Sequence, residues 1–343
     1  MSNNLQIDLS GIVSAAIDDK LKDLNIEEQI KDIIGDIAKN SSKIITVKLD
    51  GKEDKKFPLV HKQFEDLLQV AAIGENILLT GGAGLSKSTA VEQVARALDL
   101  ELIPMSFSNQ TTKTDLFGFV DANGIERVSG FVDAFINGKM FLGDEMDACS
   151  ANVFILLNSA LENGFLLRPN GEVVYAHENF RFIGTANTNL RGSKDGFTAR
   201  NKMDAATIDR FVVIEWQLDE DLEEKITDNN GWLRIVRKAR TVAETMLDNV
   251  VITPRPAYKG AKLLKAGVDI DKIIEMTLIK GLSTDERDIL LKNITAADKK
   301  RAIKDAGIKE EPEEEYYETD YEEITENDTQ DRTPDKEEDF GEW

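Results

Sequence analysis

Five short apolar runs follow one another through the first two thirds of the chain, and helical patterns separate them. None of these runs shows the alternation of apolar and polar residues that is typical of a half-exposed strand. They therefore predict strands that are buried on both faces of a parallel sheet. The predicted strands are residues 77–79, 102–107, 139–143, 180–186 and 211–214. Helical spacing of apolar residues occurs at 61–72, 91–98 and 153–162, so the pattern favours an α/β fold.

A second, helical region is predicted after Trp216, where no strand pattern recurs. Its predicted helices are residues 231–248, 256–266, 269–281 and 284–307. Two hairpins are predicted inside the α/β region, at 118–128 around Asn123-Gly124 and at 166–175 around another Asn-Gly pair.

The N-terminal residues 10–39 predict two amphipathic helices. In the second, isoleucines from Ile26 to Ile37 alternate at spacings of four and three, which is a short heptad seam. We expect the seam to pack either on the body of the protein or on a neighbouring subunit. After these helices, a small hairpin is predicted across 43–60. We therefore divide the chain into N-terminal helices and a hairpin (1–60), an α/β core (61–216), a helical lid (217–308) and an acidic tail (309–343).

Charge is concentrated at the C-terminus. The formal net charge is −22, and residues 309–343 hold 17 acidic and 3 basic residues, which leaves −8 for the first 308. We expect this tail to be disordered, because it has few aliphatic residues and no periodicity. The rest shows no broad basic surface for nucleic acid. A single cysteine, Cys149, and the lack of a signal-peptide pattern or a membrane-length apolar run predict a cytoplasmic protein.

A glycine-rich segment joins the first predicted strand to a helix, which is the context of a phosphate-binding loop. We predict that Lys87 reaches the β- and γ-phosphates of ATP and that the Ser88 hydroxyl binds Mg²⁺. Ser86 stands where a glycine is usual in this pattern, and an ordinary glycine-rich turn in a Rossmann-like sheet is the alternative. The predicted nucleotide-binding residues are Gly81, Gly82, Ala83, Gly84, Leu85, Ser86, Lys87, Ser88 and Thr89.

Polar residues end two other predicted strands. Asp144 and Glu145 follow one of them, where Asp144 would hold Mg²⁺ and Glu145 would activate the attacking water. Asn187 ends the next strand and could position that water. The alternatives are a solvated strand end for the carboxylates and a turn cap for the asparagine.

Together these residues resemble an AAA+ ATPase of the MoxR and cobaltochelatase CobS-like group, within the dynein-related branch. The resemblance covers about His61 to Leu264, including the two hairpins, and extends to phage-encoded relatives of CobS. Its motifs here are Gly81–Ser88 (Walker A), Phe141–Glu145 (Walker B), Gly184–Thr188 (sensor 1), Ile208–Phe211 (arginine finger) and Thr253–Arg255 (sensor 2).

The resemblance implies a three-layer αβα core with a parallel sheet and a C-terminal all-helical lid. It also implies ATP and Mg²⁺ as ligands and a homo-oligomeric ring, usually of six subunits. Arg210 is the candidate arginine finger that a neighbouring subunit supplies, with a plain ion pair as the alternative. Arg255 would sense the γ-phosphate from the lid of the same subunit.

Two functions remain open at this point. One is an ATP-driven machine that remodels or assembles a protein partner; in this group the partner is commonly a von Willebrand A-domain protein or a chelatase complex. The other is a nucleic-acid motor. Hairpin tips that grip phosphate need free cations, but one tip is acidic (Asp121–Glu126) and the other offers only Arg168, which favours the protein partner. An assembly scaffold that binds ATP with little turnover is a third reading.

Overall fold

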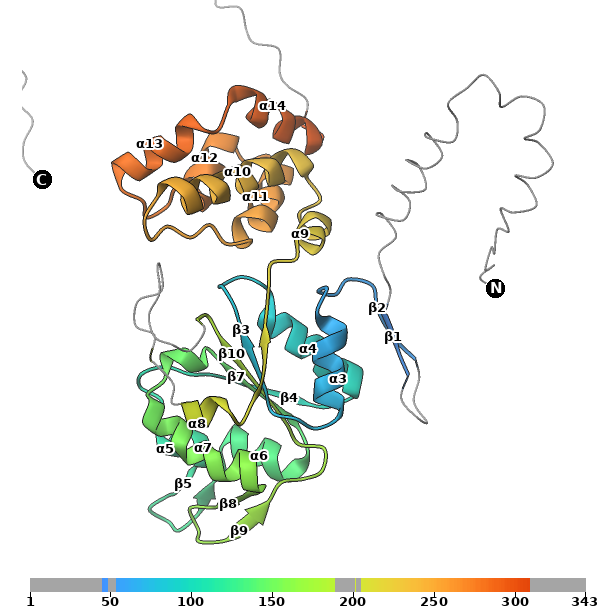
Figure 1. Cartoon of the computed structure of the whole chain (residues 1–343), viewed down its shortest axis with the longest axis vertical. Helices are drawn as coiled ribbons and strands as arrows, with labels where there is room; N and C mark the ends of the chain where they lie inside the picture. The colour runs from blue at the N-terminus through green and yellow to red at the C-terminus, as the bar shows by residue number, and fades with distance from the viewer. Residues whose placement is uncertain (1–44, 49–53, 189–200, 202–204, 309–343) are drawn as a thin grey trace, which may run out of the picture. The chain divides into compact units, whose positions relative to one another are not determined.

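A computed structural model describes residues 45–48, 54–188, 201 and 205–308 (Figure 1). At its centre is a five-stranded, entirely parallel sheet with the strand order β11–β3–β10–β7–β4. The strands are β3 (Ile77–Thr80), β4 (Leu102–Ser106), β7 (Met140–Asp144), β10 (Arg181–Ala186) and β11 (Val212–Glu215). Each lies on one of the predicted apolar runs, so the prediction of a parallel sheet is confirmed. The expectation of burial on both faces is wrong for the edge strands β4 and β11, which are only partly buried because each pairs with one neighbouring strand.

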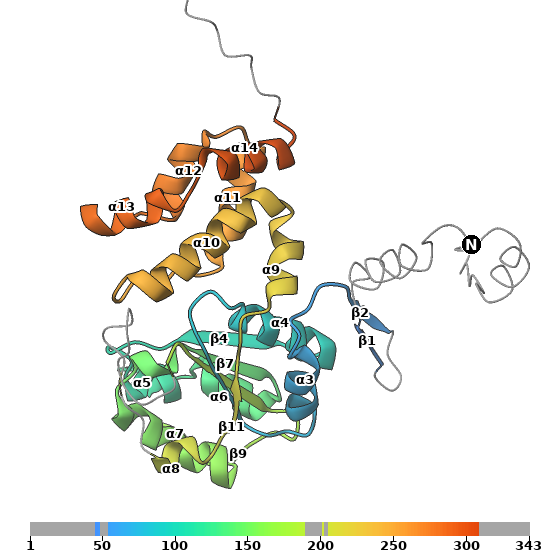
Figure 2. The same cartoon turned by 45° about the horizontal axis from the view of Figure 1, so that its top comes forward.

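Alternate residues of the central strands enter two different apolar cores, one on each face of the sheet. Ile77 and Leu79 pack with helices α3 (Phe64–Ala72) and α4 (Lys87–Leu98), whereas Leu78 packs in the other core. That second core includes apolar residues of α6 (Gly130–Asn137) and α7 (Ala151–Asn163). Figure 2 shows α3 and α4 on one side of the strands and α6 and α7 on the other. The three-layer αβα arrangement is therefore confirmed.

Both hairpins predicted within the α/β core are present. Strands β5 (Phe119–Val120) and β6 (Glu126–Arg127) pair antiparallel, as do β8 (Phe165–Leu167) and β9 (Val173–Tyr175). The prediction missed α6 and the short helix α5 (Lys113–Phe117), whose N-terminus is fixed by a capping box between Thr112 and Asp115. A five-residue helix is too short to show helical periodicity in the sequence.

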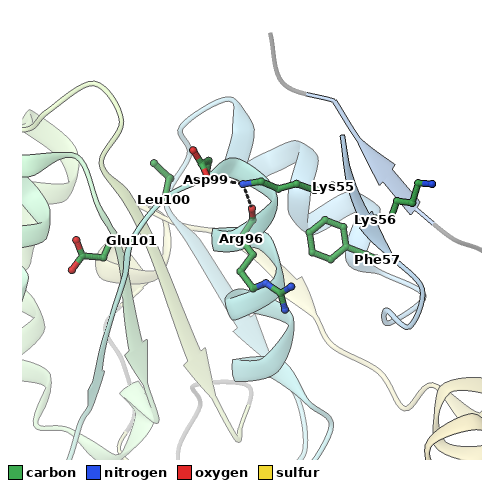
Figure 3. Close-up of a pocket in the computed structure, with 7 residues that line it drawn as sticks. All are labelled: Lys55, Lys56, Phe57, Arg96, Asp99, Leu100 and Glu101. Carbon is green, nitrogen blue, oxygen red and sulfur yellow. Dashed lines mark hydrogen bonds and ion pairs between the residues drawn. The ribbon is translucent and has the colours of Figure 1, made fainter. Parts of the chain in front are cut away.

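A third hairpin, β1 (Ile45–Val47) with β2 (Lys55–Phe57), confirms the small hairpin predicted across 43–60. It attaches to the C-terminal end of α4 and borders a cavity of about 540 Å³ (Figure 3). The Lys55 ammonium donates to the carbonyl oxygen of Arg96 at 2.8 Å and to the Asp99 carboxylate at 2.6 Å. A cation at this place also stabilises the negative end of the helix dipole.

The region after Trp216 is helical and has a core of its own, built around Trp232, Ile235, Ile273 and Leu290. Its helices are α9 (Glu220–Thr227), α10 (Asn230–Met246), α11 (Arg255–Lys265), α12 (Ile270–Thr277), α13 (Thr284–Lys292) and α14 (Ala296–Asp305). The predicted single helix at 284–307 is wrong: it is two helices, because Thr295 begins a new one with a capping box to Asp298. The acidic helix α9 was not predicted.

The predicted N-terminal helices at 10–39 and the acidic tail at 309–343 lie outside the described residues. Within the ranges that the structure describes, no helix has both the length and the apolar content needed to cross a membrane.

Candidate active site

The predicted phosphate-binding loop runs from Gly81 to Ser86, between the end of β3 and the start of α4. Neighbouring strand ends hold it: the Gly81 N–H donates to the carbonyl oxygen of Ala186 at 3.2 Å, and the Trp216 indole donates to the carbonyl oxygen of Leu85 at 2.9 Å. A Cβ on Gly81 would lie 2.2 Å from the Trp216 carbonyl oxygen. Glycine is therefore required at this position by the approach of β11.

Ser86 adopts the left-handed backbone conformation, with φ 64° and ψ 27°. A residue with a side chain is less stable there than glycine by about 1–2 kcal/mol. The left-handed backbone conformation therefore explains why glycine is usual at this position of the pattern. This chain has a serine there, with that loss of stability.

Lys87 is buried, with 6% of its surface exposed, at the first position of α4. Its ammonium donates to the carbonyl oxygens of Gly81 (2.8 Å) and Gly82 (2.9 Å) and to the side-chain oxygen of Asn187 (3.0 Å). Burial lowers the pKa of Lys87 to about 8, although the nearby carboxylates of Asp144 and Asp147 oppose the shift. The amine is thus placed in the loop with its charge only partly compensated, which favours an anionic ligand.

Asp144, the last residue of β7, lies beside the start of α4. The Ser88 hydroxyl donates to its Oδ2 at 3.1 Å, and the Thr185 hydroxyl on β10 donates to its Oδ1. The backbone N–H of Glu145 donates to the same Thr185 hydroxyl at 3.1 Å. Thr185 thereby fixes both Walker B carboxylate residues, and Glu145 takes a left-handed conformation (φ 57°) that starts the following turn.

Asn187 follows β10 and lies between the phosphate loop and the Walker B turn. Its side chain accepts from Lys87, and its backbone N–H donates to the buried carboxylate of Asp147 at 3.1 Å. Sequence reasoning missed Thr185 and Asp147. Both are polar residues within apolar surroundings next to predicted site residues, which is the signal that could have indicated them.

One cavity of about 190 Å³ brings most of the predicted residues together. Lys87 and Ser88, Asp144 and Glu145, and Asn187 line it, together with Arg255 at the start of α11. Tyr258, one turn along α11, lines it too and was not predicted. The remaining loop residues in its wall are Ala83, Gly84, Leu85, Ser86 and Thr89. Gly81 and Gly82 contribute the carbonyl groups that hold Lys87.

A second, more apolar cavity of about 320 Å³ adjoins the phosphate loop and shares Gly84, Leu85 and Tyr258 with the first. His61 lies in its wall, stacked on Trp216 with ring centroids 4.0 Å apart. Burial lowers the pKa of His61, which favours the neutral ring. Leu222 and Ile226 of α9 supply apolar surface to the same cavity.

Arg210 is not part of this cavity. It precedes β11, whose first residue, Val212, is level with Ile77 at the amino end of β3, whereas the phosphate loop follows the carboxyl end. Arg210 is half-buried and donates from its Nε to Glu162 on α7 at 2.6 Å. It therefore lies at the opposite edge of the sheet from the phosphate loop of its own chain.

The donor set fits a nucleotide with a magnesium ion. Mg²⁺ is usually bound by one or two protein oxygens with water and phosphate completing the shell, and the Ser88 hydroxyl and Asp144 carboxylate supply such a pair. In the part of the chain that the structure describes, no three His, Cys, Asp or Glu side chains are grouped to hold a metal. The magnesium would therefore depend on phosphate oxygens for much of its coordination.

Comparisons with known proteins agree with this arrangement. Residues 76–211 match the family model of the AAA domain, dynein-related subfamily. The aerobic cobaltochelatase subunit CobS of a Sinorhizobium species is 27% identical over 154 residues, which cover 42% of this chain and 46% of CobS. The von Willebrand factor A domain-containing protein 8 of Mus musculus is 26% identical over 140 residues, 36% of this chain and 7% of that protein.

This chain thus matches about half the length of CobS and a small part of the mouse protein. Among solved structures, NtrX from Brucella abortus in complex with ATP is similar, with a TM-score of 0.44 and 15% identity over 82% of this chain and 73% of NtrX. Residues 76–211, which hold most of the parallel αβα core and its glycine-rich loop, are thus similar to the AAA domain of the dynein-related subfamily, and part of the chain is similar to CobS.

Proposed function

We propose that this protein binds ATP with Mg²⁺ and hydrolyses it to ADP and phosphate. The observation that carries the proposal is a single cavity lined by Lys87 and Ser88, by Asp144 and Glu145, by Asn187 and by Arg255. These residues come from four separate parts of the chain, and each is of the type that phosphoryl transfer uses.

In the proposed reaction, Lys87 and Arg255 bind the β- and γ-phosphates as cations, and the loop N–H groups supply further donors. Magnesium held by Ser88 and Asp144 would neutralise phosphate charge. Glu145 takes a proton from the attacking water, whose oxygen forms a bond to the γ-phosphorus while the bond to the β-phosphate oxygen breaks. Asn187, fixed by Lys87 and Asp147, orients that water.

The apolar cavity beside the loop is the proposed place of the base. Its stacked His61–Trp216 pair and the aliphatic side chains of Leu222 and Ile226 suit a flat, uncharged ring. Because the two cavities share loop residues, one nucleotide would occupy both.

The test compares Glu145→Gln with the wild-type protein. We expect the variant to bind ATP with a dissociation constant close to that of the wild type but to lose turnover by at least about a hundredfold, since the general base is gone. Glu178→Gln, an exposed carboxylate outside the cavity, is the matched control and should hydrolyse ATP normally. Unchanged phosphate release by Glu145→Gln would rule the assignment out.

We also propose that the ATPase acts on a protein partner, and a von Willebrand A-domain protein is the first candidate. The two hairpins of the core support a protein over nucleic acid. Arg168, the cation of one tip, is bound on both sides by Glu126 and Glu172 and is therefore engaged within the hairpins. Arg127 is likewise paired with Asp121 at 3.0 Å.

Apolar side chains instead reach solvent from both hairpins. Phe119 and Ile125 of the first and Leu167 and Tyr175 of the second are exposed, the last to 72%. Such surface suits a polypeptide, whereas a phosphate backbone needs free cations. Capture with the ATP-bound Glu145→Gln variant should retain a protein; capture of nucleic acid with a steep loss on raising salt would support the motor instead.

The remaining expectations stay proposals: a ring of subunits, usually six, a chaperone-like role, a cytoplasmic location and a likeness to phage-encoded members.

A further inference from the structure

The turn that follows Glu145 is held by a fully buried carboxylate. Asp147 lies in the short helix η1 (Met146–Ala148). Its Oδ2 accepts hydrogen bonds from the backbone N–H groups of Asn187 at 3.1 Å and Thr188 at 3.0 Å, and from the Thr188 hydroxyl at 2.9 Å. The carboxylate thus fixes the end of β10 against the Walker B turn.

A second segment fastens the same turn from another direction. The Asn201 N–H donates to the carbonyl oxygen of Asp147 at 2.7 Å, and its side-chain amide donates to the carbonyl oxygen of Cys149 at 2.9 Å and to the side chain of Asn109 at 3.1 Å. Asn201 precedes helix α8 (Ala205–Ile208), which leads to Arg210. The turn therefore joins the strand end that carries Asn187 to the segment that leads to Arg210.

We infer that Asp147 is a positioning residue for hydrolysis, which sets Asn187 and Glu145 relative to each other without touching the nucleotide. This inference rests on the proposed ATPase function. Bonds to an ionised carboxylate are roughly twice as strong as neutral ones, and three of them converge on one oxygen. The Asn187 side chain accepts from Lys87 at 3.0 Å, whereas the carbonyl oxygens of Gly81 and Gly82 also hold Lys87, so a shift of Asn187 would affect the attacking water more than the phosphate loop.

The role predicts a division between binding and turnover. Asp147→Asn keeps the side-chain volume but removes the charge, so the N–H groups of Asn187 and Thr188 are held more weakly. We expect kcat to fall by about tenfold or more while the dissociation constant of a non-hydrolysable ATP analogue changes by less than about threefold. Thr188→Val removes only the hydroxyl bond and should lower kcat by about two- to fivefold.

A control variant separates positioning from a general loss of packing. Thr277→Val removes a buried hydroxyl that donates to the carbonyl oxygen of Ile273 in α12, far along the chain from the site. It should leave both kcat and the dissociation constant unchanged. If Asp147→Asn does not fold, the kcat and dissociation constant of Thr188→Val can be compared with those of Thr277→Val instead.

A double-mutant cycle tests whether Asp147 acts through Asn187. In an Asn187→Ala background, Asp147→Asn should lower kcat much less than in the wild-type background, because the group it positions is absent. Independent, multiplicative losses would overturn the inference, as would full turnover by Asp147→Asn in an otherwise active protein. A wild-type protein that binds but never hydrolyses ATP would instead overturn the proposed function itself.

Discussion

Ser86 has a left-handed backbone conformation (φ 64°) in which a glycine would be unstrained. Ser86→Gly relieves about 1–2 kcal/mol of strain, but the glycine costs about 0.5–1 kcal/mol of backbone entropy on folding. We therefore expect the free energy of unfolding to rise by no more than about 1.5 kcal/mol and ATP affinity to change by less than about tenfold. Urea unfolding and calorimetric titration measure the two quantities. Ser86→Ala keeps the strain and separates any effect of the hydroxyl; a far larger gain in affinity for Ser86→Gly would show that the natural loop is impaired.

Lys87 makes nucleotide binding depend on pH. Its pKa in the free protein is lowered by burial to about 8, below the ordinary 10.5, and bound phosphates would raise it again. Below about pH 8 the amine is already charged and affinity should be flat; above it, binding must take up a proton, so affinity should fall towards tenfold per pH unit. Titrations of an ATP analogue between about pH 7 and about pH 9.5 measure this slope. In Lys87→Arg the side chain stays charged over this pH range, so the decrease in affinity with pH should disappear. An equal slope in that variant would contradict the attribution of the pH dependence to Lys87.

At the scale of elements, the break between α13 and α14 shows how a local contact overrides a continuous helical pattern. Thr295 accepts from the Asp298 N–H, and the Asp298 carboxylate accepts from the Thr295 N–H at 3.1 Å. Thr295→Ala should lower the free energy of unfolding by about 1 kcal/mol, measured by denaturant titration. Thr241→Ala, within α10, is the control and should be neutral or slightly stabilising, because alanine is the better helix former. An equal loss in both variants would mean that the capping box contributes nothing.

At the scale of the whole molecule, the predicted role of Arg210 as an arginine finger implies that one chain alone would not suffice for the proposed turnover. Arg210 lies near the amino ends of the strands, whereas its own phosphate loop follows their carboxyl ends, so as an arginine finger it would act on the nucleotide of another chain. Leaving the pair with Glu162, which is 54% exposed, costs about 0.2–1 kcal/mol, whereas an arginine finger is worth about 10³–10⁵ in rate. Breaking the Arg210–Glu162 ion pair would therefore cost little free energy compared with the transition-state stabilisation that an arginine finger supplies.

Mixing two inactive variants tests this role in trans. Arg210→Ala should bind ATP but lose turnover, and Lys87→Ala should not bind it. A mixture of the two should recover part of the phosphate-release activity, since some interfaces combine an intact finger with an intact loop. No recovery in a mixture that demonstrably forms mixed oligomers would exclude Arg210 as the finger.

The sequence by itself determined the elements whose signal is local. Apolar runs predicted all five strands of the sheet, and Asn-Gly turns predicted both hairpins of the core, because burial in the sheet and turn geometry are visible within a few residues. The phosphate loop and the Walker B carboxylates could be predicted for the same reason: their proposed chemistry depends on short spacings along the chain. The predicted N-terminal helices and the disorder of the acidic tail stay predictions, since both segments lie outside the described residues.

The tertiary structure decided what depends on contacts between distant segments. Thr185 and Asp147 belong to the site because they bond to Asp144 and Asn187 some forty positions away. His61, which stacks on Trp216, lines the adjoining apolar cavity. Arg168 reads as a free cation in the sequence, yet Glu126 of the other hairpin binds it. In each case the residue is held by a hydrogen bond, a ring contact or an ion pair with a partner that is distant in the sequence. Because that partner is brought close only when the chain has folded, no local sequence pattern could predict the contact.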